Sequence, residues 1–208
     1  KMGDSHLAQA IKILMNSFYG VMGTPGCRFY NPGLPRAITG TGQWILKTTR
    51  SFLEQKGYGV IYGDTDSVFV QLNPTQVSDC DGAAKKLASD MNEFFTKKFT
   101  DEFDLDSHLE IEFEKHFTRF FLPAIRGGGD GAKKRYVGLV KKNHKEKLVF
   151  TGLEFVRSDW TRFAKNFQYD LFHRIFHDQE VTEWIRQMVS ELKNHLHDED
   201  LVYKKRLT

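Results

Sequence analysis

The stretch Tyr62-Gly63-Asp64-Thr65-Asp66-Ser67 decides how the fold of this chain is interpreted. Short apolar runs of β-type residues flank it, at positions 60–62 and 68–70. Two such runs joined by a few residues containing Gly and Asp predict a β-hairpin, with its turn centred on residues 63–66. The predicted tip carries two carboxylates one residue apart, those of Asp64 and Asp66.

Asp64 and Asp66 are candidate ligands for divalent metal ions. In a strand or tight turn, residues i and i+2 project to the same side, so both carboxylates can serve one metal cluster. Mg²⁺ takes one or two carboxylates and leaves its other positions to water and phosphate oxygens. Two such ions can activate an attacking oxygen and stabilise a leaving one. The alternative is that both residues form the turn by hydrogen-bonding their own backbone.

A helix predicted over about residues 8–19 has two distinct faces. At about 100° per residue, Lys12, Asn16 and Tyr19 share one face. A lysine cation and an asparagine amide suit triphosphate oxygens, and a tyrosine can stack or present its hydroxyl. An ordinary polar helix face is the alternative. The other face is apolar, and we expect it to pack on a core through Leu7, Ile11, Leu14 and Phe18.

The remaining pattern predicts an α/β core in the middle of the chain, followed by a helical subdomain. A Gly- and Pro-rich loop at 20–35 precedes a helix at about 36–56, which Gly57 ends, and a further helix is expected at about 83–99. The segment 109–116 alternates cleanly between apolar residues and acids and so predicts a strand. Further strands are expected at 117–122, 135–140 and 148–151, with a flexible glycine turn at 127–131. From about residue 157 the pattern is helical.

Composition narrows the class of protein. The chain has 208 residues, of which 40% are hydrophobic and 13% aromatic, as expected for a folded protein with a phenylalanine-rich core. No stretch approaches the roughly 18 apolar residues of a membrane span. The chain has only two cysteines, Cys27 and Cys80. So few cysteines favour reduced thiols and a cytosolic protein. No paired Cys or His spacing points to zinc.

Positive charge is concentrated in one segment. The net charge is only +3, yet residues 133–147 hold many basic residues and a single acid, Glu146. Such a density suggests a polyanion partner, although the segment taken alone is more simply interpreted as a solvated basic face. The basic residues are Lys133, Lys134, Arg135, Lys141, Lys142, Lys145 and Lys147.

Four motifs in one order resemble those of family B DNA polymerases. Lys12-Ile13-Leu14-Met15-Asn16-Ser17-Phe18-Tyr19-Gly20 resembles the fingers motif Lys-x-x-x-Asn-Ser-x-Tyr-Gly. The stretch quoted first resembles the second catalytic carboxylate motif of the palm. Lys133-Lys134-Arg135-Tyr136 resembles the Lys-Lys-x-Tyr motif, and residues 152–160 resemble the junction of palm and thumb. Within the family, the amino-acid sequence of these motifs is most similar to that of the bacterial DNA polymerase II branch.

The resemblance implies roles for individual residues. Asp66 would be the principal metal ligand and Asp64 an accessory carboxylate, in a site that holds two Mg²⁺ ions in the complete enzyme. Lys12 and Asn16 would face the triphosphate of the incoming deoxynucleotide, and Tyr19 would lie near the nascent base pair.

The resemblance also implies a fold, partners and domains. The fold would be of the α/β (α+β) class, a polymerase palm with an antiparallel sheet packed on helices. Primer–template DNA would lie along Lys133, Lys134, Arg135 and Tyr136. A sliding clamp is a candidate partner through regions outside these residues, and no membrane is expected. Residues 1–33 would be the end of the fingers and its connection to the palm, 34–156 the palm, and 157–208 the start of the helical thumb. The expected location is the bacterial cytoplasm, at the nucleoid.

The family's first palm carboxylate motif lies upstream of its fingers, and nothing before Lys12 resembles it. We therefore expect these residues to be a fragment of a DNA-directed DNA polymerase that is inactive in isolation. Two alternatives remain at this point. One is a catalytically silent polymerase homologue that binds nucleic acid, and the other is a different two-metal polymerase such as a reverse transcriptase.

Overall fold

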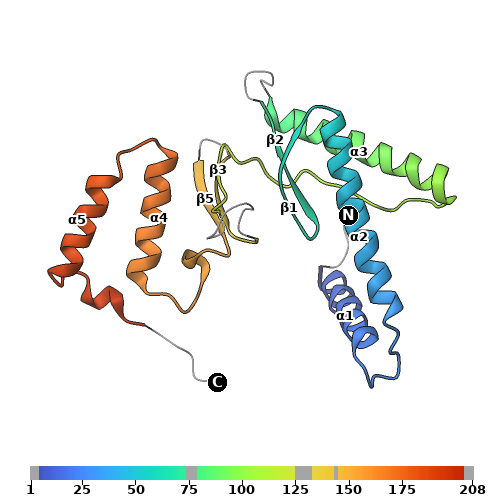
Figure 1. Ribbon diagram of the computed structural model, residues 1–208, viewed down its shortest axis with the longest axis horizontal. Helices are drawn as coiled ribbons and strands as arrows, with labels where there is room; N and C mark the ends of the chain where they lie inside the picture. Colours follow the sequence, from blue (N-terminus) through green and yellow to red (C-terminus); the bar gives the residue numbers. More distant parts are fainter. Residues whose placement is uncertain (1–4, 74–78, 125–132, 143–144, 204–208) are drawn as a thin grey trace. The chain divides into compact units, whose positions relative to one another are not determined.

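Two helices and a β-hairpin make up the first of two units in the computed structural model, Lys1–Asn73. In chain order they are α1 (Ser5–Gly23), α2 (Gly33–Gln55), β1 (Gly59–Asp64) and β2 (Ser67–Gln71) (Figure 1). The second unit is Pro74–Thr208. The structure describes residues 5–73, 79–124, 133–142 and 145–203, and the glycine turn predicted at 127–131 lies outside these ranges.

The C-terminus of α2 forms as predicted. Gly57 has a φ of 83°, in the left-handed region that favours glycine. Its N–H donates to the carbonyl of Glu54 at 3.0 Å, and the N–H of Tyr58 donates to the carbonyl of Leu53, also at 3.0 Å. These bonds satisfy carbonyls that the helix leaves unpaired. Leu53 is fully buried, and α2 packs along both strands of the hairpin. The helix ending therefore fixes where β1 begins.

The expectation that the apolar face of α1 packs on a core was wrong. Each of its four residues is at least 48% exposed. The helix also continues through the first part of the predicted loop, as far as Gly23. There Gly23 lies against Pro35, and the N–H of Asn31 donates to the carbonyl of Met22 at 3.0 Å. The sequence pattern identifies an apolar face, but only tertiary neighbours decide whether it is covered.

The second unit combines a three-stranded antiparallel sheet with helices, which confirms the predicted α/β (α+β) class. The sheet has the order β3-β4-β5. In chain order the elements are α3 (Cys80–Phe103), β3 (Arg119–Phe121), β4 (Tyr136–Lys142), β5 (Lys145–Thr151), the 3₁₀ helix η1 (Glu154–Val156), α4 (Arg162–Phe176), α5 (Thr182–Lys193) and the 3₁₀ helix η2 (Asp198–Leu201). The described helices include none long and apolar enough to cross a bilayer.

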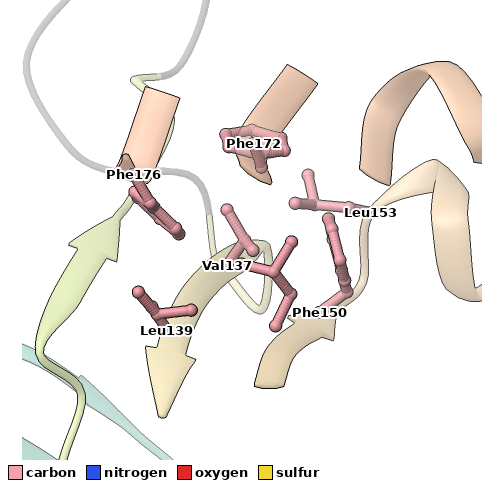
Figure 2. Packing of buried hydrophobic residues seen from close by; sticks show 7 residues of the cluster. Val137, Leu139, Phe150, Leu153, Phe172 and Phe176 are labelled. Atoms are coloured by element: carbon pink, nitrogen blue, oxygen red, sulfur yellow. The ribbon is translucent and has the colours of Figure 1, made fainter. Parts of the chain in front are cut away.

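One face of this sheet carries a cluster of buried hydrophobic residues (Figure 2). Val137 pairs with Phe150 in the antiparallel ladder, and paired residues project to the same side of a sheet. Phe172 of α4 packs against Phe150, with ring centroids 5.9 Å apart. The full cluster is Val137, Leu139, Leu148, Phe150, Leu153, Phe172 and Phe176. Since side chains alternate along a strand, Tyr136 lies on the opposite face of the sheet.

The strand predicted at 109–116 is absent. Residues 104–117, all of them described, form neither helix nor strand. The side chain of Asn92, on α3, takes the place of a neighbouring strand at Ile111. Its Oδ1 accepts from the Ile111 N–H at 2.7 Å, and its Nδ2 donates to the Ile111 carbonyl at 2.9 Å. The predicted alternation in burial is present, with half-buried Ile111 and exposed Glu112. The pattern encodes that alternation and not the hydrogen-bonding partner.

The C-terminus of α4 is attached to the sheet by His177. Its Nδ1 lies 2.7 Å from the carbonyl oxygen of His173, and its Nε2 lies 2.7 Å from Glu146 Oε2. Lys141 Nζ lies 3.3 Å from the other oxygen of Glu146. With an acceptor at each ring nitrogen, the doubly protonated imidazolium is favoured. The hydrogen bonds to His173 and Glu146 raise the pKa of His177, and those from His177 and Lys141 lower the pKa of Glu146.

These shifts predict how stability depends on pH. The raised pKa of His177 adds stability below the ordinary value of 6.5, which is lost as pH rises through the raised pKa. The lowered pKa of Glu146 adds stability above 4.5, which is lost as pH falls through the lowered pKa. We expect His177→Gln to lower the urea midpoint at about pH 5.5 and to have less effect at about pH 8.5. His108→Gln, at an exposed histidine, is the control. An equal effect of His177→Gln at both pH values would contradict the assignment.

Candidate functional site

The tip of the first hairpin is a two-residue loop formed by Thr65 and Asp66. Asp64 ends β1 and pairs with Ser67, the first residue of β2. The N–H of Asp66 donates to the carbonyl of Asp64 at 2.5 Å, and Ser67 Oγ donates to the same carbonyl at 3.2 Å. The predicted hairpin is confirmed, but its turn lies further along than expected, because Gly63 is part of β1.

A β-bulge at Ile61 determines where the two carboxylates stand. The register of the ladder shifts by one residue there. Without this extra residue, Asp64 would stand directly opposite Asp66 around a loop of one residue, shorter than hairpin loops are. With it, Asp64 pairs with Ser67 and remains in the ladder, while Asp66 moves into the loop. The strand rule that places i and i+2 on one side therefore does not extend from Asp64 to Asp66.

The residue between the two carboxylates has a strained backbone. Thr65 has a φ of 50°, a region that β-branched residues rarely adopt. Its Oγ1 donates to Asp64 Oδ1 at 3.0 Å, which ties the strained residue to the first carboxylate. Backbone strain of this kind gathers at functional sites, where the surrounding structure holds it in place.

The donor set at the tip suits a magnesium ion. Asp64 is half-buried and Asp66 is exposed. In the described part of the chain, no group of three or more His, Cys, Asp or Glu side chains could hold a metal ion. Two carboxylates alone fit Mg²⁺, which leaves its remaining positions to water and phosphate oxygens, and they do not fit zinc, which needs more protein ligands.

The predicted nucleotide-facing residues lie on another element of the same unit. Lys12, Asn16 and Tyr19 follow one another along α1, and all three are exposed, Tyr19 at 41%. Nearby, Ser17 Oγ donates back to the carbonyl of Ile13 at 2.9 Å. The polar stripe therefore exists on the helix surface, as the helical period predicted.

The basic run forms an exposed turn immediately before β4. Lys133, Lys134 and Arg135 are exposed, and Lys134 has a φ of 58°. The turn lies directly on Gly152, because a Cβ built there would be 1.9 Å from the carbonyl oxygen of Lys134. Gly152 was not among the predicted site residues. It lies within the junction motif, but no local pattern shows that it contacts the turn.

Tyr136, the first residue of β4, belongs to an aromatic cluster on the face of the sheet opposite the buried hydrophobic cluster. Its ring centroid lies 5.5 Å from that of Phe120 and 6.3 Å from that of Phe117. The ring of Phe117 covers Gly138, where a Cβ would be 2.2 Å from it. The sheet thus supports Tyr136 beside the basic turn. Lys133–Tyr136 are consecutive residues of the second unit, whereas Asp64 and Asp66 lie at the hairpin tip of the first, one in the ladder and one in the loop.

The sequence profile of one family matches almost the whole chain. DNA polymerase family B matches residues 5–206. The chain therefore belongs to DNA polymerase family B.

Particular relatives show which branch of the family the chain is similar to. It is 44% identical over 210 residues to DNA polymerase II of Escherichia coli (strain K12), covering 100% of this chain and 26% of that protein. It is 31% identical over 188 residues to DNA polymerase 2 of Aeropyrum pernix, covering 89% of this chain and 20% of that protein. The resemblance predicted from the motifs is confirmed. The chain spans about a quarter of the length of the Escherichia coli relative.

A solved structure supports the same assignment. The family B DNA polymerase from the hyperthermophilic archaeon Pyrobaculum calidifontis matches with a TM-score of 0.58 and 26% sequence identity. The match covers 93% of this chain and 22% of that one. Fold and sequence thus point to one family.

Proposed function

We propose that this chain supplies the second catalytic carboxylate motif, a nucleotide-facing helix and a DNA-contacting turn to a template-directed DNA polymerase. The reaction adds a deoxynucleotide to a primer 3′-hydroxyl and releases pyrophosphate. The observation that carries the proposal is the bulged hairpin of a family B chain, which places Asp64 at the end of β1 and Asp66 in the strained loop that follows.

The two carboxylates would divide the metal-binding role. Asp66 is exposed in the loop and would present its carboxylate as the principal ligand. Asp64 is half-buried, accepts from Thr65 and would act as the accessory carboxylate. When bound, two Mg²⁺ ions would promote attack by the primer oxygen and stabilise the leaving phosphate. The backbone of the hairpin tip, strand end and loop together, would hold both side chains before substrate arrives, which reduces the cost of ordering them during the reaction.

On the exposed stripe of α1, Lys12 and Asn16 would bind the triphosphate of the incoming deoxynucleotide. A lysine ammonium donates up to three hydrogen bonds and adds charge, and an asparagine amide donates beside it. Tyr19 would lie near the nascent base pair. DNA would contact the second unit at the turn of Lys133, Lys134 and Arg135, followed by Tyr136.

We expect Lys12→Ala to weaken the use of nucleotides. Losing a charge-assisted hydrogen bond costs roughly 1.5–3 kcal/mol, so KM for deoxynucleotides should rise about tenfold or more with a smaller change in kcat. Steady-state primer extension by a complete polymerase containing this chain measures both constants. Lys47→Ala, at an exposed lysine of α2, is the matched control. An unchanged response to nucleotide concentration in Lys12→Ala would rule out this role.

We further propose that the 208 residues do not extend primers alone, because their sequence resembles only the second of the family's two palm carboxylate motifs. Half of the ligand set for the two metal ions would then be missing. Primer extension by the purified chain, in a preparation free of other polymerases, would refute this. In the complete enzyme, a sliding clamp would bind other regions, and the enzyme would work at the bacterial nucleoid in the cytoplasm.

A further inference from the structure

The side chain of Glu154 connects the basic turn to α4. Glu154 Oε1 accepts from Nη2 of Arg135 in an ion pair. Glu154 Oε2 accepts from Nε2 of Gln168, on α4, at 2.8 Å. Gln168 in turn accepts the N–H of Phe155 through its Oε1 at 2.7 Å. Both oxygens of the carboxylate and both ends of the amide are thus used, so the pair has a defined geometry.

Glu154 is more enclosed than the arginine that it binds. Its side chain is 20% exposed, whereas that of Arg135 is 44% exposed. Burial raises the pKa of Glu154, but hydrogen bonds from Gln168 and Arg135 outweigh it and leave the pKa lowered. The carboxylate is therefore ionised at neutral pH and holds the guanidinium from the protein side.

A second contact holds the same turn two residues before Glu154. The backbone of Gly152 lies so close to the carbonyl of Lys134 that it leaves no room for a Cβ, and both residues have a positive φ. The turn is therefore fixed at two adjacent points, through a backbone contact at Lys134 and an ion pair at Arg135. Lys133 is exposed at the same turn.

We propose that Glu154 and Gln168 are positioning residues for DNA binding: they hold Arg135 and thereby fix the turn that presents Lys133 and Lys134 to the phosphate backbone. This inference rests on the proposed contact between the turn and DNA. Within the DNA-contacting turn, Arg135 would then serve mainly as the anchor, through its ion pair with Glu154, and the two lysines would supply most of the charge that faces the phosphates. Because Gln168 belongs to α4, the position of that helix is coupled to the geometry of the basic turn.

The sign of a charge effect tests this inference. Glu154→Gln and Asp178→Asn each remove one negative charge from the carboxylate partner of an arginine in the second unit. Asp178 forms an ion pair with Arg119 at 2.6 Å. Arg119 belongs to β3 and stands opposite Leu139 of β4, beyond the basic turn. If charge alone mattered, both variants would bind DNA more tightly, because DNA is a polyanion. We expect Asp178→Asn to bind as tightly as the wild type or slightly more tightly, and Glu154→Gln to bind more weakly, by on the order of fivefold.

The measurement is fluorescence anisotropy of a labelled primer–template duplex, titrated at low salt with the 208-residue chain. Amide hydrogen exchange over residues 133–137, without DNA, is the second readout. We expect faster exchange in Glu154→Gln than in Asp178→Asn or the wild type. Unchanged exchange, or binding at least as tight as in the wild type, would overturn the positioning role.

Two further variants separate the possible failures. Gln168→Leu leaves the Arg135–Glu154 pair in place but removes its link to α4, so a smaller loss of affinity and faster exchange are expected. It also provides the test if Glu154→Gln does not fold. Lys134→Gln tests the DNA contact itself. If it binds DNA as the wild type does, the contact proposed for the turn is wrong, while the exchange measurements still decide whether Glu154 fixes the turn.

Discussion

Asp66→Asn, in a complete polymerase containing this chain, is expected to lower the rate of primer extension by on the order of a thousandfold or more. Asparagine keeps the shape of the side chain but removes the charge that binds a metal ion, and metal-ion catalysis contributes several kcal/mol to such reactions. The loop should keep its fold, because its hydrogen bond uses the backbone N–H of Asp66. Single-turnover primer extension in Mg²⁺ measures the chemical step directly.

Two comparisons make that experiment specific. Asp101→Asn removes a carboxylate from an exposed position on α3 and should leave extension unchanged. Asp64→Asn should cause a smaller loss than Asp66→Asn, because the amide oxygen can still accept from Thr65 and the role proposed for Asp64 is accessory. An Asp66→Asn enzyme with the wild-type rate would remove the catalytic assignment of the hairpin tip.

Gly152→Ala is expected to destabilise the second unit by about 3 kcal/mol. An alanine there would have to adopt a φ of 61° and place its Cβ 1.9 Å from the Lys134 carbonyl oxygen. Relief requires the basic turn or the end of β5 to move, because the obstacle is backbone and cannot rotate away. Urea denaturation followed by circular dichroism measures the loss, and DNA binding by the displaced turn should weaken with it.

Gly57→Ala provides a control that separates conformational strain from steric overlap. Gly57 also has a positive φ, 83°, but a Cβ there would meet nothing within 4 Å. Its replacement should cost about 1 kcal/mol, the conformational part alone. Equal losses for the two variants would show that the close approach of Gly152 to Lys134 has no energetic weight.

The hairpin illustrates what the sequence could and could not predict. Apolar runs on both sides of the acidic stretch were enough to predict two strands and a tip with two carboxylates. Nothing in the alternation marked Ile61 as the bulged residue, because a bulge depends on how both strands pair. That one residue decides that Asp64 stays in the ladder and Asp66 enters the loop.

Local pattern likewise could not supply the long-range partners. The period of α1 correctly separated an apolar face from the stripe of Lys12, Asn16 and Tyr19, yet the apolar face proved to be exposed. The motif resemblance implied that Arg135 contacts DNA, but no local pattern indicated its partner Glu154, which lies 19 residues further along the chain. Motif resemblance predicted the positions of the site residues, and their individual roles in catalysis remain predictions.

The pairing of Asn92 with Ile111 has a consequence for how this chain can vary during evolution. The single amide side chain of Asn92 bonds both the N–H and the carbonyl of Ile111, which in a sheet would be bonded by a neighbouring strand. Selection should therefore keep an asparagine at position 92 and a constant spacing around position 111. Insertions and deletions between homologues should instead accumulate in the irregular stretch that begins after the end of α3 at Phe103, where an added residue disturbs no ladder.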